Sequence, residues 1–200
     1  MIMTRRFPVR CAFAVAVAWC LLVAGCASGP PAATRDFLDT ETGVTVTSSR
    51  VPIVLYQNNP AMAAYARRVI YMGPIEVNRS GSYRYFLWLG AWTTDQPPDP
   101  VAQRDGLESI IVLVDGEPLN LDMAGWTPEA IGASRPVYVK PVASAVDVYY
   151  PVTIDQIRFM AAATDLSLRT TGASSAEYRL WDSQASARGN LQAFLEGVGY

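Results

Sequence analysis

The sequence predicts a mainly β protein: an antiparallel β-sandwich with two or three short helices, one of them C-terminal. Eight short segments are rich in Val, Ile, Tyr, Phe or Trp and are bounded by Gly, Pro, Asn or Ser, a composition typical of strands. Turn signals separate neighbouring segments, and helical periodicity is confined to a few places. An immunoglobulin-like sandwich is one form of this class, and a closed barrel with an internal ligand is the alternative.

The predicted strands form hairpins where a turn signal lies between them. Asp115-Gly116 between two apolar runs is typical of a two-residue hairpin turn, and the polar segment 78–82 predicts another turn. Pro74 lacks a backbone N–H, so it predicts a bulge or an edge position. The strands are expected over 44–48, 53–56, 69–77, 83–93, 109–114, 118–122, 137–141 and 146–152, and a final hairpin over 166–170 and 178–181.

The two best helix predictions rest on a capping signal and on an apolar stripe. Thr153 and Gln156 have the spacing of a capping box, which predicts a helix over 154–163. Leu191, Phe194 and Leu195 recur at helical spacing near the end of the chain. The polar side of that terminal helix lacks the basic residues of an interfacial helix, so we expect it to close the β-sandwich.

The first residues have the parts of an export signal. Three arginines precede an apolar stretch over 11–22, which is too short to span a bilayer because a spanning helix needs about 20 apolar residues. Small residues follow, and Gly29-Pro30-Pro31 then predicts a short, partly stiff tether. The expected organisation is a signal peptide over 1–25, a tether over 26–35 and one globular domain over 36–200.

The end of the signal, Val23-Ala24-Gly25-Cys26, resembles the lipobox of bacterial lipoproteins. The resemblance implies that Cys26 becomes the lipidated first residue, with two or three acyl chains that make the membrane anchor effectively permanent. Ala27 follows the cysteine where an aspartate would imply retention in the inner membrane, so the expected location is the periplasmic face of the outer membrane. An unmodified thiol at Cys26 is the alternative reading. Beyond residue 26, the chain resembles only uncharacterised lipoproteins of Gram-negative bacteria, which transfer no activity.

The charge of the processed chain excludes a nucleic-acid partner. Loss of the first 25 residues removes three of the 16 basic residues and none of the 18 acidic ones, which leaves a net charge of −5. A nucleic-acid binder needs a basic surface that displaces counterions from phosphates. Arg67-Arg68 is the one basic pair after the signal, and on a strand its two side chains would be solvated on opposite faces.

The residue inventory removes most catalytic chemistry. The chain has no histidine, and its three cysteines lie in the signal or at the lipidation site. This excludes disulfides, Cys- or His-based zinc sites and Ser-His or Cys-His nucleophiles, so we expect no catalytic residue, no metal and no cofactor. Lys140, the sole lysine, is expected to be a surface charge on the strand 137–141. Asp115 and Glu117 flank a turn glycine, and we expect them to be structural.

The aromatic residues are the remaining candidates for contact with a ligand or partner. The segment 83–92 is apolar on both faces, which favours a central strand that packs in the core. Trp126, Tyr149 and Tyr150 are the candidate contact residues, because aromatic rings bind sugars and partner proteins. If they bind a ligand, the three should line one concave surface.

Three classes of function follow from these observations. The first is a non-enzymatic envelope lipoprotein that is anchored to the membrane through Cys26 and acts as an interaction or assembly module for an envelope or cell-wall partner. The second is a periplasmic protein that binds a saccharide, a peptidoglycan fragment or a lipid. The third is a carboxylate-dependent glycan hydrolase, which requires two acidic groups that face each other in a cleft.

Overall fold

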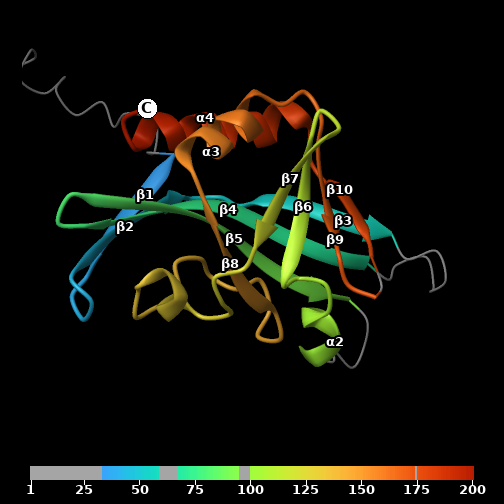
Figure 1. Cartoon of the computed structure of the whole chain (residues 1–200), viewed down its shortest axis with the longest axis horizontal. Coiled ribbons are helices and arrows are strands. Elements are labelled where there is room, and N and C mark those ends of the chain that lie inside the picture. The colour runs from blue at the N-terminus through green and yellow to red at the C-terminus, as the bar shows by residue number, and fades with distance from the viewer. Residues whose placement is uncertain (1–32, 59–66, 95–99, 174) are drawn as a thin grey trace, which may run out of the picture. The chain divides into compact units, whose positions relative to one another are not determined.

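The computed structural model describes residues 33–58, 67–94, 100–173 and 175–200 (Figure 1). Ala33–Tyr200 forms one compact unit. The signal peptide, Cys26 and most of the expected tether lie outside the described residues. In the part of the chain that the structure describes, no helix is long and apolar enough to cross a membrane.

The protein is mainly antiparallel β, as the sequence predicts. The strands are β1 (Thr34–Asp39), β2 (Val44–Ser49), β3 (Ile53–Asn58), β4 (Arg67–Arg79), β5 (Ser82–Thr93), β6 (Ser109–Val114), β7 (Glu117–Asp122), β8 (Val146–Val152), β9 (Leu166–Thr170) and β10 (Glu177–Leu180). The helices are α2 (Pro100–Arg104), the 3-10 turn η1 (Pro128–Ile131), α3 (Ile154–Ala162) and the C-terminal α4 (Gln184–Gly197).

The ten strands of the described residues belong to one sheet in which β4 occupies the centre. One edge of β4 pairs with β5 along its whole length, while β3 and β2 share the other edge. The β3 pairing ends at Met72 and the β2 pairing begins at Ile75, so Pro74 lies at a local edge between them. This position suits a residue without a backbone N–H, and it agrees with the edge position that the sequence predicts.

The sheet curls until its two ends meet. Eight strands follow one another in the order β8, β5, β4, β3, β10, β9, β6 and β7. Just after β7, the backbone of Gly125 accepts a hydrogen bond from the N–H of Tyr149 in β8 over 3.0 Å, and the N–H of Ala124 donates to Tyr149 over 2.7 Å. The strands therefore form one curled sheet that a single bridge closes, in place of two stacked sheets.

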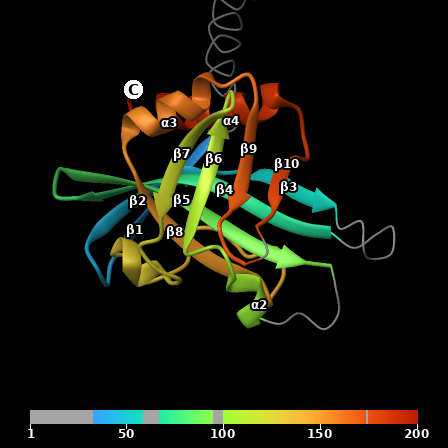
Figure 2. The same ribbon diagram turned by 45° about the vertical axis from the view of Figure 1, so that its right-hand side comes forward.

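The inside of the curl is packed with side chains. Inward residues of neighbouring strands alternate with outward ones, and α3 and α4 lie side by side over one end of the curl (Figures 1 and 2). The helices contribute Ile157, Met160, Leu191 and Phe194 to this core, and these residues have at most 1% of their surface exposed. The C-terminal helix thus closes the β structure, as the sequence predicts.

A second core lies on the outer face of the sheet, which we define as the face that points away from the interior of the curl. The segment 126–145 covers β4, β5 and β8 there. Tyr138 stacks on Trp88 with ring centroids 4.5 Å apart, and its hydroxyl donates to the carbonyl of Pro74 over 2.9 Å. Arg35 of β1 lies over the other side of the Tyr138 ring. The prediction of a strand over 137–141 is wrong, because Tyr138 inserts into the gap between β2 and β3 as part of an irregular segment.

The turn and capping predictions are confirmed. Asp115 and Gly116 both have positive φ, 51° and 83°, as a two-residue hairpin turn requires. The hydroxyl of Thr153 accepts from the N–H of Gln156 over 3.1 Å, and the Gln156 side chain accepts from the N–H of Thr153 over 2.8 Å. The sequence reading misses β1, which begins inside the expected tether at Thr34, and the short helix α2.

Candidate functional site

The structure places two of the three candidate contact residues in the interior. Tyr149 and Tyr150 have no exposed surface, and as neighbours on β8 they point into the two different cores. Trp126 is half-buried against the inner core, with the Arg104 guanidinium 5.1 Å from its ring centre. The three do not line one concave surface, so the contact role expected for Tyr149 and Tyr150 is corrected to core packing.

A different set of aromatic side chains lies on the open half of the outer face, over β3, β4 and β10. The ring of Trp181 meets that of Tyr56 edge to face, with centroids 5.1 Å apart. The guanidinium of Arg67 lies over both rings, 4.7 Å from the Trp181 centroid and 6.0 Å from that of Tyr56. Trp181 is 52% exposed. We call Tyr56, Arg67 and Trp181 the arginine–aromatic cluster.

Backbone hydrogen bonds hold the members of this cluster in place. Arg67 begins β4, and its N–H donates to the hydroxyl of Thr94 over 2.8 Å while its carbonyl accepts from the N–H of Thr94 over 3.0 Å. The N–H of Trp181 donates to the carbonyl of Val54 over 2.8 Å, which extends the pairing of β10 with β3. The cluster is thus assembled from three strands whose pairing fixes its geometry.

The two arginines of the sequence pair have different surroundings. Arg67 points to the outer face, whereas Arg68 lies near the buried Tyr178 on the other side of β4, so the expected opposite orientation is confirmed. Arg67 is not an ordinary solvated charge, because two aromatic rings lie beneath it. A cation over an exposed ring contributes about 0.5–1 kcal/mol. Among the described residues, Arg67 has no ion pair.

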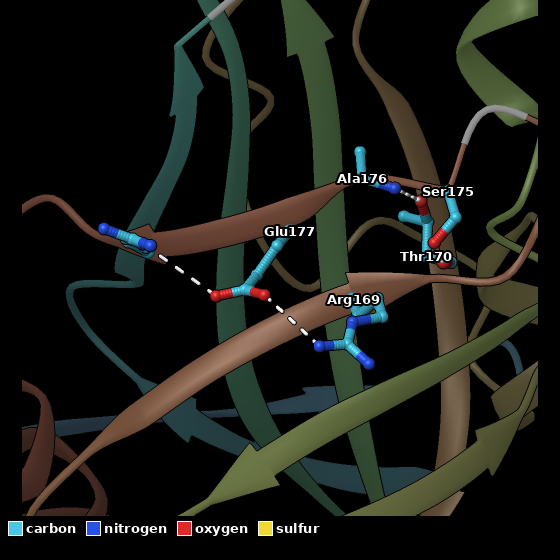
Figure 3. Close-up of polar contacts among 6 residues, drawn as sticks. Arg169, Thr170, Ser175, Ala176 and Glu177 are labelled. Atoms are coloured by element: carbon cyan, nitrogen blue, oxygen red, sulfur yellow. Dashed lines mark hydrogen bonds and ion pairs between the residues drawn. The ribbon is translucent and has the colours of Figure 1, made fainter. Parts of the chain in front are cut away.

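A set of ion pairs continues the outer face next to the cluster. The Glu177 carboxylate lies 3.3 Å from the guanidinium of Arg169 and 3.8 Å from that of Arg179 (Figure 3). Arg179 stands directly opposite Tyr56 in the pairing of β10 with β3, which makes the ion pairs and the cluster one continuous surface. The turn between β9 and β10 is fixed by Thr170, whose hydroxyl accepts from the N–H of Ala176 over 3.0 Å (Figure 3).

A shallow polar groove follows the outer face of β9 and β10. It consists of two adjoining hollows of about 350 and 500 Å³ that share Asp165, Ser167 and Glu177 as lining residues. Both shared acids have partners: Glu177 pairs with two arginines, and Asp165 accepts from the side chain of Gln184 over 3.0 Å. In the described ranges, no group of three or more acidic, His or Cys side chains could hold a metal ion.

The acids and the lysine that the sequence singles out do not line this groove. Asp115 accepts from the hydroxyl of Thr164 over 2.6 Å and from the N–H of Asp165 over 2.7 Å, and these bonds lower the pKa of the Asp115 carboxyl. Lys140 is exposed, as expected of a surface charge, but it lies outside any strand and its ammonium lies 3.2 Å from the buried carboxylate of Asp147. Asp147 also accepts from the indole N–H of Trp88 over 3.2 Å.

Sequence reasoning missed the arginine–aromatic cluster, whose members come from separate strands. Each of them follows an ordinary strand pattern, and only the pairing of β3 with β4 and β10 brings them together. The one available signal was Trp181, a large aromatic residue at the end of a strand beside Asp182. No known protein-family model, curated protein or solved structure matches the chain.

Proposed function

We propose that this protein is an envelope lipoprotein, anchored through Cys26 at the periplasmic face of the outer membrane, whose globular domain is a non-enzymatic interaction module. The lipobox-like segment that ends at Cys26 supports the anchor. The open outer face with its arginine–aromatic cluster supports the interaction. The proposal of an interaction module rests mainly on this cluster.

The composition of the face favours a partner protein. Trp, Tyr and Arg are the residues that most often dominate the binding energy of protein interfaces, and here they adjoin one another with a polar rim of ion pairs. The rings and the guanidinium are already in contact, so binding would order few additional side chains. The matching partner surface presents an apolar group for Trp181 and a carboxylate for Arg67, which lacks an ion pair among the described residues.

Crosslinking of intact envelopes, followed by capture of the full-length chain, tests the proposal. Trp181→Ala and Arg67→Gln should each reduce the recovered partner by about tenfold or more, the effect of removing a hot-spot side chain. Tyr83→Ala is the matched control, because Tyr83 is 53% exposed and lies at the start of β5, next to the turn that joins β4 to β5. If the partner is lost equally from all three variants, or from none, the arginine–aromatic cluster is not its binding site.

A glycan ligand is the second candidate, and the polar groove is the observation that favours it. Asp165, Glu177 and Gln184 offer hydrogen-bonding groups to a sugar along the groove. Trp181 follows the groove-lining residue Leu180, although the ring itself turns toward Tyr56 and is not part of the lining. Binding of soluble peptidoglycan fragments to the purified chain, abolished by Glu177→Gln and unchanged in Trp181→Ala, would favour this candidate over the partner protein.

A further inference from the structure

The chain enters the globular domain beside the end of helix α4. β1 begins at Thr34, and its side chain lies so close to Gly197 that a Cβ at position 197 would come within 2.6 Å of it. Figure 1 shows β1 starting beneath the end of α4 that carries the C label. Any tether attached to Thr34 therefore leaves the domain at this helical end.

Exposed aromatic side chains gather at the same end. The ring of Tyr200 is 51% exposed and meets that of Tyr85 with centroids 6.2 Å apart. The guanidinium of Arg158 in α3 lies 4.8 Å from the Tyr200 ring centre. Phe159, the next residue of α3, is 37% exposed. We call Arg158, Phe159 and Tyr200 the end patch.

The covalent length between the lipidation site and the domain limits how far this end can lie from a bilayer. Eight residue steps separate Cys26 from Thr34, and a chain spans at most about 3.5 Å per step, so the distance is at most about 28 Å whatever conformation the segment takes. A lipidated Cys26 would therefore keep the end patch near the membrane surface. The opposite end of β8, six residue steps away, lies about 20 Å farther from α3.

We propose that the end patch rests in the interfacial region of the bilayer and orients the domain on it; this inference rests on the lipid anchor of the proposed function. Aromatic rings with a polar or charged companion favour the headgroup level of membranes. The contact is apolar and not electrostatic, because Asp155 pairs with Arg158 at 2.7 Å and Glu196 is exposed nearby on α4. The acyl chains supply the anchoring, and the patch selects the orientation.

This orientation leaves the arginine–aromatic cluster accessible. Trp181 precedes α4, and the 14 residues of that helix extend about 20 Å from its start to the end patch. The cluster therefore adjoins the end of α4 that is opposite to the end patch. An interaction module of this design would meet its partner at the side of the domain.

Fluorophores attached to single cysteines test the orientation, because the mature chain has no thiol other than the one that the lipid would occupy. Ala162→Cys places a label three residues after Phe159 on the same face of α3. Val139→Cys is the control, because Val139 is 82% exposed beside Lys140, which contacts the start of β8 at the opposite end. The full-length lipidated chain is reconstituted in vesicles of phosphatidylethanolamine and phosphatidylglycerol that contain a headgroup-quencher lipid.

We expect quenching at position 162 to exceed that at 139 by about twofold or more, and the difference to vanish when Phe159→Ser and Tyr200→Ser are added. Thermal unfolding of the two triple variants, each with one cysteine and both serines, verifies that the exposed substitutions leave the domain folded. Equal quenching at both positions, in a chain that still floats with the vesicles, would overturn the orientation and leave the anchor intact. A chain that does not float with the vesicles would overturn the anchor and, with it, this inference.

Discussion

The hydroxyl of Tyr138 donates a hydrogen bond to the carbonyl of Pro74 over 2.9 Å, in the gap on β4 between its pairing with β3 and its pairing with β2. The ring lies against Gly73 and stacks on Trp88. One side chain thus fills a gap in the sheet, satisfies a buried carbonyl and ties the segment 126–145 to the outer face.

Substitution Gly73→Ala should destabilise the protein because the added methyl group would overlap the ring of Tyr138. That ring is 3% exposed and held on both sides, so it cannot move aside, and we expect a loss of about 1–3 kcal/mol in the free energy of unfolding. Gly189→Ala in α4 is the control: its Cβ would meet nothing, and helix propensity predicts a gain of about 1 kcal/mol. Urea unfolding measures both, and an unchanged midpoint for Gly73→Ala would refute the packing argument.

The ion pair of Lys140 and Asp147 should contribute to the free energy of unfolding, and this contribution should depend on pH. Burial raises the pKa of Asp147, while Lys140 and the indole of Trp88 oppose that shift. We expect Lys140→Met to lose about 1–2 kcal/mol at neutral pH, less than a fully buried pair because the Lys140 side chain is 39% exposed. The loss should shrink at acidic pH, where Asp147 becomes protonated and needs no cation.

A double-mutant cycle measures that coupling. Asp147→Asn in the Lys140→Met background should recover part of the lost stability, because no buried charge is then left unpaired. Asp155→Asn, which removes the exposed pair with Arg158, is the control and should change stability by about 0.5 kcal/mol or less. Additive effects of the two substitutions at 140 and 147 would show that the pair contributes nothing to folding.

Local signals in the sequence predict local structure well. Asp115-Gly116 fixes its hairpin because glycine and aspartate tolerate the positive φ that the turn needs, and the Thr153 and Gln156 pair fixes the start of α3. Both signals act within a few residues. Neither depends on how distant strands pair.

The wrong predictions concern segments whose structure depends on tertiary contacts. Val137 and Tyr138 are buried like strand residues, yet the gap above Pro74 holds them in an irregular segment. Tyr149 and Tyr150 look like binding aromatics, yet β8 has a core on both of its faces. The arginine–aromatic cluster needs the pairing of three strands, which alternation of apolar residues does not specify. The curl of the sheet is hidden from the sequence for the same reason.

Glu76→Gln should stabilise the protein at neutral pH. Glu76 is buried on β4, one of its carboxylate oxygens has no hydrogen-bond partner among the described residues, and burial together with the nearby Asp36 raises its pKa. A raised pKa in the folded state means that the ionised carboxylate of Glu76 destabilises the folded protein, so glutamine should stabilise it by on the order of 1 kcal/mol at neutral pH. This difference should disappear as falling pH protonates Glu76 in the wild type. Glu117→Gln on the exposed start of β7 is the control for loss of a carboxylate at the surface.

Asp39 should produce the opposite pH dependence. The backbone N–H of Ser134 donates to its carboxylate, as does the Ser134 hydroxyl over 2.8 Å, and the N–H groups of Thr42 and Glu41 add to this. These bonds lower the pKa of Asp39 from its ordinary value of 3.8 to about 2. A lowered pKa in the folded state stabilises the protein above the unfolded value, and that contribution is lost as pH falls from about 4 through about 2.

Asp39→Asn isolates this contribution. The variant keeps the shape of the side chain but lacks the charge, so the wild type should exceed it in stability at neutral pH and the gap should narrow between about pH 4 and pH 2. Ser134→Ala removes only the hydroxyl donor, and the backbone donors to Asp39 remain. The difference in stability between the wild type and Ser134→Ala should therefore change less steeply with pH. Thermal unfolding across this pH range gives a stability curve for the wild type and for each variant. The other carboxyl groups titrate in all of them, so their contribution cancels in the difference between two curves. A gap that stays constant with pH would mean that Asp39 holds the segment 133–145 through the shape of its hydrogen bonds and not through its charge.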